Sequence, residues 1–150
     1  MSFVWNHTMN DTPKHIFTYG SLMFPEVWSR VVKGDYTSCH AWLSGYARRQ
    51  VHQKDYPALI PAHAENVVQG KVYFDVAAED QIALDAFEGE EYQRRTEKLL
   101  TPEGNEIEVE VYLFKPEFLH QIQDDEWDVS HFEQNLLLRF LHQEGLNKPS

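Results

Sequence analysis

A two-residue alternation of apolar and polar residues restricts the fold of this chain more than any other sequence feature. Within 67–76, the apolar residues Val72, Phe74 and Val76 fall on one face. Within 106–114, the apolar side comprises Ile107, Val109, Val111 and Leu113. Successive side chains of a strand point to opposite faces. Both segments are therefore predicted to be strands with one buried face.

Four further runs are predicted strands: residues 15–19, 39–51 with a break at Gly45, 56–62 and 92–100. Pro57 and Pro61 bracket the third run, which favours an edge strand because proline cannot donate to a hydrogen-bonded ladder. The last run is predicted to pair antiparallel with 106–114 across a turn at 102–105.

Three segments are predicted helices: residues 25–33, 79–88 and 129–143. In the second, an apolar stripe is expected to face the core: Ile82, Ala83, Ala86 and Phe87. In the third, Ser130 and Glu133 fit a capping box. Too few helices intervene to connect parallel strands. The predicted fold class is α+β, a small, mostly antiparallel and strongly curved β-barrel with outer helices.

The length of 150 residues suits one domain. We expect a flexible N-terminal segment over 1–14, a single domain over 15–145 and a C-terminal tail over 146–150. No stretch reaches the ~20 apolar residues that a membrane-spanning helix needs. Cys39 is the single cysteine and is interpreted as a packed thiol, so nothing requires an oxidising compartment. We therefore expect a cytoplasmic protein, and nothing demands more than a monomer.

Charge is distributed unevenly along the chain. Residues 1–75 carry 7 Lys/Arg and 6 Asp/Glu, a balance of +1, whereas residues 76–150 carry 6 and 18, a balance of −12. An acidic chain of this kind is repelled by nucleic acid and by anionic membranes. Both are therefore excluded as expected partners.

Motifs for bound cofactors are missing from the sequence. It contains no glycine-rich phosphate loop, no HExxH and no cysteine pair, so we expect no cofactor and no metal. Asp124, Glu126 and Asp128 have the alternate spacing of a calcium loop, but Val129 replaces the glycine required at the sixth position. This segment is interpreted as an exposed acidic loop before a helix.

The first candidate site is the turn that follows the run at 15–19. In Tyr19-Gly20-Ser21-Leu22-Met23, a strand enters a glycine turn. Successive backbone N–H groups after such a turn can bind carboxylate or carbonyl oxygens without a cationic side chain. Ser21 lacks the second glycine of a nucleophile elbow, because Met23 stands there. A Ser-His-Asp hydrolase nevertheless remains an alternative, since triads are defined by geometry.

The second candidate site is Glu88, at the end of the predicted helix 79–88 and before Gly89. The helix dipole disfavours a negative charge there, and Glu90 and Glu91 follow closely. These influences are expected to raise the pKa of Glu88 toward a value useful for proton transfer. Arg48 and Arg49 can bind a substrate carboxylate or pair with acidic groups, and we interpret both as structural.

Taken together, these segments resemble the γ-glutamylcyclotransferase-like superfamily, and most of all its avirulence-induced-gene-like branch. The resemblance covers about residues 15–142. Its motifs, in chain order, are Tyr19-Gly20-Ser21-Leu22-Met23, Tyr56-Pro57-Ala58-Leu59, Gly70-Lys71-Val72-Tyr73, Leu84-Asp85-x-Phe87-Glu88-Gly89-x-x-Tyr92-x-Arg94 and Trp127-Asp128.

The resemblance implies a small barrel with a pocket at its mouth. It also implies Glu88 as acid/base, Tyr19 to Leu22 as the loop that holds a γ-glutamyl group, and Tyr92 near that pocket; Met23, next in the motif, is expected to bind substrate with this loop. Family members of known activity convert a γ-glutamyl amide to 5-oxoproline without cofactor. The expected partner is thus a small molecule with a γ-glutamyl group, and the alternative is a metabolite-binding module of the same fold.

Overall fold

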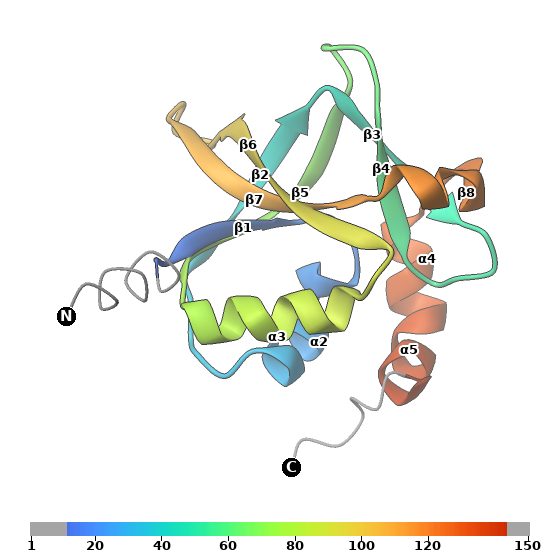
Figure 1. The fold of residues 1–150 in the computed structure, drawn as a ribbon, viewed down its shortest axis with the longest axis horizontal. Helices are drawn as coiled ribbons and strands as arrows, with labels where there is room; N and C mark the ends of the chain where they lie inside the picture. The colour runs from blue at the N-terminus through green and yellow to red at the C-terminus, as the bar shows by residue number, and fades with distance from the viewer. Residues whose placement is uncertain (1–11, 144–150) are drawn as a thin grey trace.

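The computed structural model describes residues 12–143, so residues 1–11 of the predicted N-terminal segment and the tail at 146–150 lie outside the described residues. Five strands form a closed barrel in the order β1 (Lys14–Thr18), β5 (Val67–Val76), β2 (Ser38–Ser44), β6 (Tyr92–Leu100) and β7 (Glu106–Phe114) (Figure 1). Neighbours in this order are antiparallel, whereas β1 and β7 close the barrel in parallel, with Ile16 opposite Glu110 and Phe17 opposite Val111. The predicted barrel is confirmed.

A second sheet lies beside the barrel, with the order β4 (Pro57–Pro61), β3 (Tyr46–Val51) and β8 (Ile122–Glu126). The break predicted at Gly45 is where the chain leaves the barrel strand β2 for this sheet. The strand β4 lies at the sheet edge, as its two prolines predicted. The acidic segment was wrongly expected to be a loop: Asp124 to Glu126 belong to β8, where Glu126 pairs with Arg49. The segment was not recognised as a short edge strand because its residues are charged and exposed.

The helices lie on one side of the barrel and the second sheet in Figure 1. They are α2 (Pro25–Val31), α3 (Ala78–Glu88) and a C-terminal helical segment of α4 (Val129–His131), a π-helical turn (Phe132–Leu136) and α5 (Leu137–Gln143). Short 3₁₀ turns occupy Ser21–Met23 and Pro116–Gln121. Among the described helices, none is both long and apolar enough to cross a membrane.

Two helix details differ from the sequence prediction. The inward stripe predicted for α3 was only partly right: Phe87 packs against the core, but Ile82 is 69% exposed, and Leu84, Asp80 and Gln81 are the buried residues. These two polar side chains can face inward because hydrogen bonds satisfy them. At the start of α4 the cap is Asp128, not Ser130, because the Asp128 carboxylate accepts the backbone N–H of His131.

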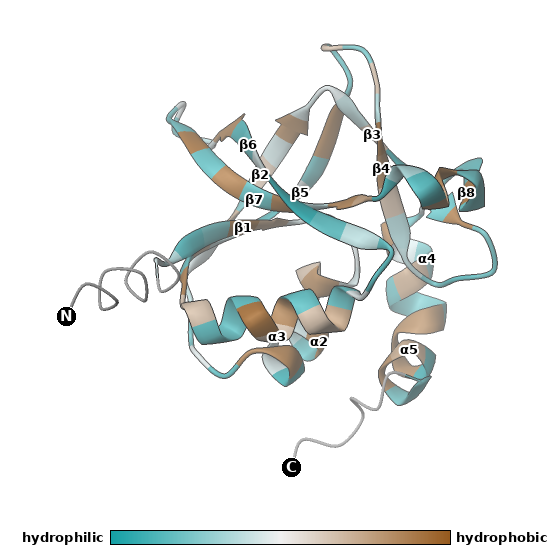
Figure 2. Cartoon of the chain, viewed as in Figure 1, coloured by the Kyte–Doolittle hydropathy of each residue, from teal (hydrophilic) through white to brown (hydrophobic). Residues whose placement is uncertain are grey.

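The apolar residues form two buried clusters, one on each side of β1 and β5. One cluster fills the barrel and includes Phe17, Val72 and Val111. The other lies between the barrel, the helices and the second sheet, where the ring of Trp28 on α2 stacks on Tyr73 of β5 at 3.6 Å. Figure 2 shows apolar and polar residues alternating along the barrel strands and the helices. A strand covered on both faces, such as β1, is thereby fixed in position.

Asp80 connects the loop after α2 to the first turn of α3. Its carboxylate is 3% exposed and accepts the backbone N–H groups of Lys33 (2.9 Å) and Gly34 (3.0 Å) and the hydroxyl of Tyr36 (2.6 Å). Burial alone raises the pKa of Asp80, but these hydrogen bonds outweigh it and hold the pKa below its usual value. The ionised carboxylate therefore contributes to stability.

We expect Asp80→Asn to lower the free energy of unfolding by about 1–3 kcal/mol, because an amide cannot accept three hydrogen bonds with charge assistance. A depressed carboxyl pKa contributes stability above its unfolded pKa of about 4 and loses it as pH falls through the folded pKa. Urea unfolding of the variant should therefore show a weaker loss of stability below pH ~4 than the wild type. The control is Glu79→Gln, on the exposed neighbouring residue. Equal acid sensitivity of both variants would contradict this role.

Candidate active site

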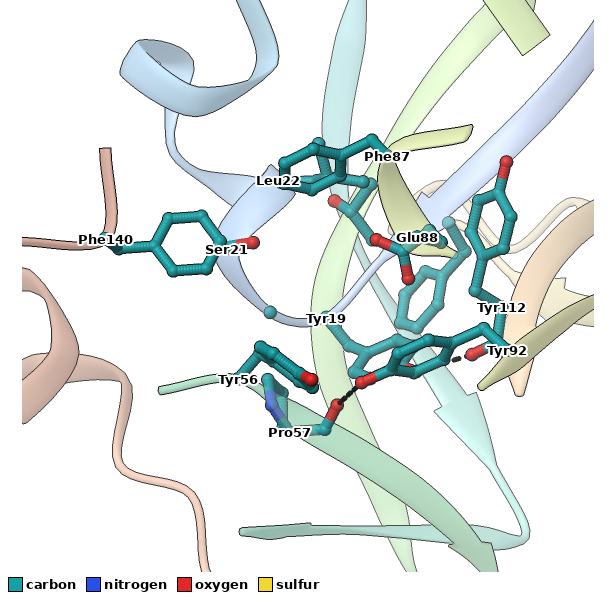
Figure 3. Close-up of a pocket in the computed structure, with 13 residues that line it drawn as sticks. Tyr19, Ser21, Leu22, Tyr56, Pro57, Phe87, Glu88, Tyr92, Tyr112 and Phe140 are labelled. Carbon is teal, nitrogen blue, oxygen red and sulfur yellow. Dashed lines mark hydrogen bonds between the residues drawn. The ribbon is translucent and has the colours of Figure 1, made fainter. Parts of the chain in front are cut away.

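A cavity of about 130 Å³ opens where the end of β1 meets α3, β4 and α5. Figure 3 shows its side chains converging on a common space. The lining residues are aromatic, small or apolar with one carboxylate: Phe17, Thr18, Tyr19, Gly20, Ser21, Leu22, Tyr56, Pro57, Phe87, Glu88, Tyr92, Tyr112 and Phe140. Both segments singled out from the sequence thus meet in one cavity.

The turn from Tyr19 to Leu22 forms one wall of this cavity. β1 ends at Thr18, and a 3₁₀ turn begins at Ser21, closed by a hydrogen bond from Met23 N–H to Gly20 C=O (3.0 Å). Gly20 packs so closely on Pro57 of β4 that a Cβ atom there would lie 2.8 Å from the proline Cδ. A side chain at this position would force the turn away from β4.

Buried phenols fix the floor of the cavity. The hydroxyl of Tyr19 donates to the carbonyl of Tyr112, and the hydroxyl of Tyr92 donates to the carbonyl of Pro57 at 2.7 Å (Figure 3). Burial, followed by the charge of Glu88, raises the pKa of Tyr19 well above its usual value. Burial is also the main cause that raises the pKa values of Tyr92 and Tyr112. These phenols stay neutral and act as hydrogen-bond donors.

Glu88 is the last residue of α3 and is half-buried. The helix ends there because Gly89 adopts φ 82°, a left-handed value that favours glycine. Figure 3 shows the Glu88 side chain directed among the phenols, with Phe87 beside it. Its charge contributes to the raised pKa values of Tyr19, Tyr92 and Tyr112, behind burial in each case. Proton transfer is the chemistry that a carboxylate in such a cavity can perform.

A hydrogen-bonded network supports the side of α3 that carries Glu88. Asp85, one turn earlier, accepts the hydroxyl of Tyr112 at 2.6 Å and lies 3.3 Å from the Nε atom of Arg94. Arg94 also donates to the buried amide oxygen of Gln81 at 2.7 Å. The network ties α3 to both β6 and β7, so that Glu88 sits on a fixed helix end.

The candidate residues named from the sequence fall into two groups. Tyr19, Gly20, Ser21, Leu22, Glu88 and Tyr92 line the cavity, whereas Met23 does not and packs on the core between barrel and helices. No histidine is among the lining residues that the structure describes. Ser21 therefore has no base beside it within that lining, and the hydrolase alternative loses its geometric support.

Sequence reasoning did not assign site roles to Tyr56, Pro57, Phe87, Tyr112 and Phe140, which also line the cavity. Tyr56 and Pro57 stood in one of the ordered motifs, which was the available signal. From the sequence, Phe140 was predicted to be a core position of an amphipathic helix. In the structure it contacts the core, and its ring centroid lies 6.1 Å from that of Phe87. Among the described residues, no group of three His, Cys, Asp or Glu side chains is placed to hold a metal ion.

Comparisons with known proteins give a consistent result. The model of a family described as gamma-glutamyl cyclotransferase, AIG2-like, matches residues 16–129. AIG2-like protein D of Arabidopsis thaliana is 31% identical over 144 residues, covering 92% of this chain and 94% of that protein. A solution structure of an Arabidopsis thaliana protein has a TM-score of 0.64 at 24% identity, covering 93% of this chain and 96% of that chain. A structure described as a gamma-glutamyl cyclotransferase has a TM-score of 0.61 at 18% identity, covering 91% of this chain and 89% of that chain.

The buried phenols predict a steep loss of stability in alkali. A group with a raised folded pKa stabilises the protein below its unfolded pKa, about 10 for tyrosine, and the contribution is lost as pH rises through the folded value. Tyr19, Tyr92 and Tyr112 should ionise only when the fold is lost, and Tyr46 and Tyr73, with pKa values of about 12, only far into alkali. Tyrosinate absorbance and far-ultraviolet circular dichroism during one alkaline titration measure this. Complete ionisation with an unchanged dichroism spectrum would contradict it.

Proposed function

Because this chain belongs to the gamma-glutamyl cyclotransferase, AIG2-like family, we propose that it converts a γ-glutamyl amide to 5-oxoproline and releases an amine. In this proposal Glu88 is the general acid/base, and the turn from Tyr19 to Leu22 holds the γ-glutamyl group. The observation that carries it is the convergence of this turn and Glu88 on one cavity lined by buried phenols.

In the proposed reaction, the α-amine of the substrate attacks its own γ-carbonyl carbon. A carbon–nitrogen bond forms to close the five-membered ring, and the original amide bond breaks. The α-amine is protonated in water near neutral pH, so a carboxylate must first take up a proton. Glu88 accepts one proton before the attack and returns it to the leaving nitrogen. The attacking nitrogen loses its second proton as the ring closes, and this proton passes to the released amine, which leaves as an ammonium ion, so that atoms and charges balance with no covalent enzyme intermediate.

The cavity walls suit the other requirement, a curled substrate. An intramolecular attack gains its rate from holding amine and carbonyl close together. The turn at Gly20 and the rings of Tyr19, Tyr56 and Tyr92 enclose a space that favours a folded conformation over an extended one. Backbone N–H groups of the turn are the proposed partners of the substrate carboxylate or of the tetrahedral oxygen.

The lining also bears on the leaving amine. Glu88 is the one charged side chain among the described residues of the lining, and Glu91 lies close by, accepting the hydroxyl of Tyr56 at 3.0 Å. A leaving group with its own carboxylate would enter this cavity without a cationic partner, and desolvating an unpaired charge is unfavourable. We propose that the preferred leaving amine carries no carboxylate.

Glu88→Gln is expected to lower 5-oxoproline formation by about 10²–10⁴-fold, because a positioned acid/base contributes that much. The purified protein is incubated with a panel of γ-glutamyl compounds, and product is followed by mass spectrometry. The control is Glu90→Gln, an exposed carboxylate two residues further on, which should retain activity. Turnover that survives in a folded Glu88→Gln protein would exclude Glu88 as the catalyst. No product from the wild type on any compound would favour a metabolite-binding module.

A matched pair of substrates tests the leaving-group proposal. γ-Glutamyl methylamide and γ-glutamylglycine differ only by the carboxylate on the leaving amine. We expect kcat/KM to be at least about tenfold higher for the methylamide, which corresponds to about 1.4 kcal/mol of transition-state binding. Equal values, or a preference for γ-glutamylglycine, would show that a partner for the carboxylate exists.

A further inference from the structure

Arg48 holds the proposed substrate-binding turn from outside the cavity. It lies on β3 of the second sheet and is half-buried. Its Nη1 atom donates to the carbonyl of Tyr19 at 2.7 Å and to the carbonyl of Gln69 on β5 at 3.2 Å. Its guanidinium also lies over the ring of Trp127, 5.6 Å from the centroid. One side chain therefore connects the second sheet, the barrel and the turn.

The position of Arg48 is unusual for a structural cation. Both hydrogen bonds found for its side chain end on backbone carbonyls, and burial lowers its pKa while Glu126 partly offsets this. Arg48 does not line the cavity; it lines a separate groove, together with Trp42, Gln69 and Trp127. Keeping a desolvated guanidinium there is unfavourable unless its contacts compensate. Its shortest contact is the carbonyl of Tyr19.

The Tyr19 carbonyl belongs to the same peptide unit as the Gly20 N–H. That unit is planar and trans, so its C=O and N–H bonds point in opposite directions. With the carbonyl held toward Arg48, the Gly20 N–H is directed away from Arg48. The Tyr19 side chain is fixed as well, by its hydroxyl bond to the Tyr112 carbonyl. The peptide plane that opens the turn thus has little freedom to rotate.

We propose that Arg48 is a positioning residue that fixes the Tyr19–Gly20 peptide plane and thereby aims the Gly20 N–H at the ligand in the cavity. Its effect on turnover rests on the proposed function, whereas its effect on the turn does not. The charge on Arg48 also polarises this peptide unit, which makes the Gly20 N–H a stronger donor to an anionic oxygen.

The kinetic test compares Arg48→Met, Arg48→Lys and Arg49→Met. Methionine fills much of the same space without a donor, and lysine keeps one charged donor. For Arg48→Met we expect a ten- to hundredfold loss of kcat/KM, of the order set by one charge-assisted hydrogen bond, with most of the change in KM. Arg48→Lys should recover part of it. Arg49→Met, on the half-buried neighbour whose side chain donates to the Arg48 carbonyl, should stay near wild type.

A second measurement is independent of catalysis. Hydrogen exchange of backbone amides, followed by NMR, should become faster at residues 20–23 in Arg48→Met and remain unchanged in the β6–β7 pair. Binding of 5-oxoproline should weaken in parallel. Uniformly faster exchange across the chain would show a general stabilising role, and unchanged exchange at 20–23 would show no role in the turn; either overturns the proposal. If the wild type makes no product but the selective exchange effect is seen, the cyclotransferase proposal fails while the role of Arg48 stands.

Discussion

Parallel pairing of β1 with β7 is the constraint on which the site depends. The other contacts in the barrel are antiparallel, and this one closes it by placing Phe17 opposite Val111. Closure carries the end of β1 past the Tyr112 carbonyl, which accepts the hydroxyl of Tyr19. Since β7 pairs with β6 along its whole length, Tyr92 and the start of β6 are brought to the same end of the barrel. The turn, the phenols and α3 meet there for that reason.

The phenols at this end contribute both to stability and to the chemical character of the cavity. Tyr19 and Tyr92 are buried, and their hydroxyls donate to the backbone carbonyls of Tyr112 on β7 and Pro57 on β4, respectively. Such a bond satisfies a buried donor and acceptor at once. Burial keeps both rings neutral beside Glu88, so that Glu88 is the one charged side chain in the described lining.

The spacing of apolar residues predicted most strands and helices, because the residues of one buried face recur at a regular spacing within a short stretch of sequence. The strands β5, β6 and β7 and the α2 and α3 segments follow directly from such patterns. The inward face of α3 did not, because it includes Asp80 and Gln81 beside Leu84, and the hydrogen-bond partners of these two polar side chains lie outside the helix. Of the second sheet, β3 and β4 were predicted as strands, but β8 was not, because it is polar and exposed and its pairing with β3 is a tertiary contact.

The same distinction applies to the site. Tyr19, Gly20 and Glu88 were found from ordered motifs, and the structure brings them together, yet their assigned roles stay predictions until turnover is measured. Arg48 was interpreted as structural from the sequence, and its contact with the turn could not be predicted, since the carbonyl of Tyr19 is 29 residues away. Its placement has a physical rationale. A cation inside the cavity would pair with Glu88, hold it in the charged form and weaken it as a proton acceptor. Outside the cavity lining, the same cation acts on an anionic ligand through the Tyr19–Gly20 peptide.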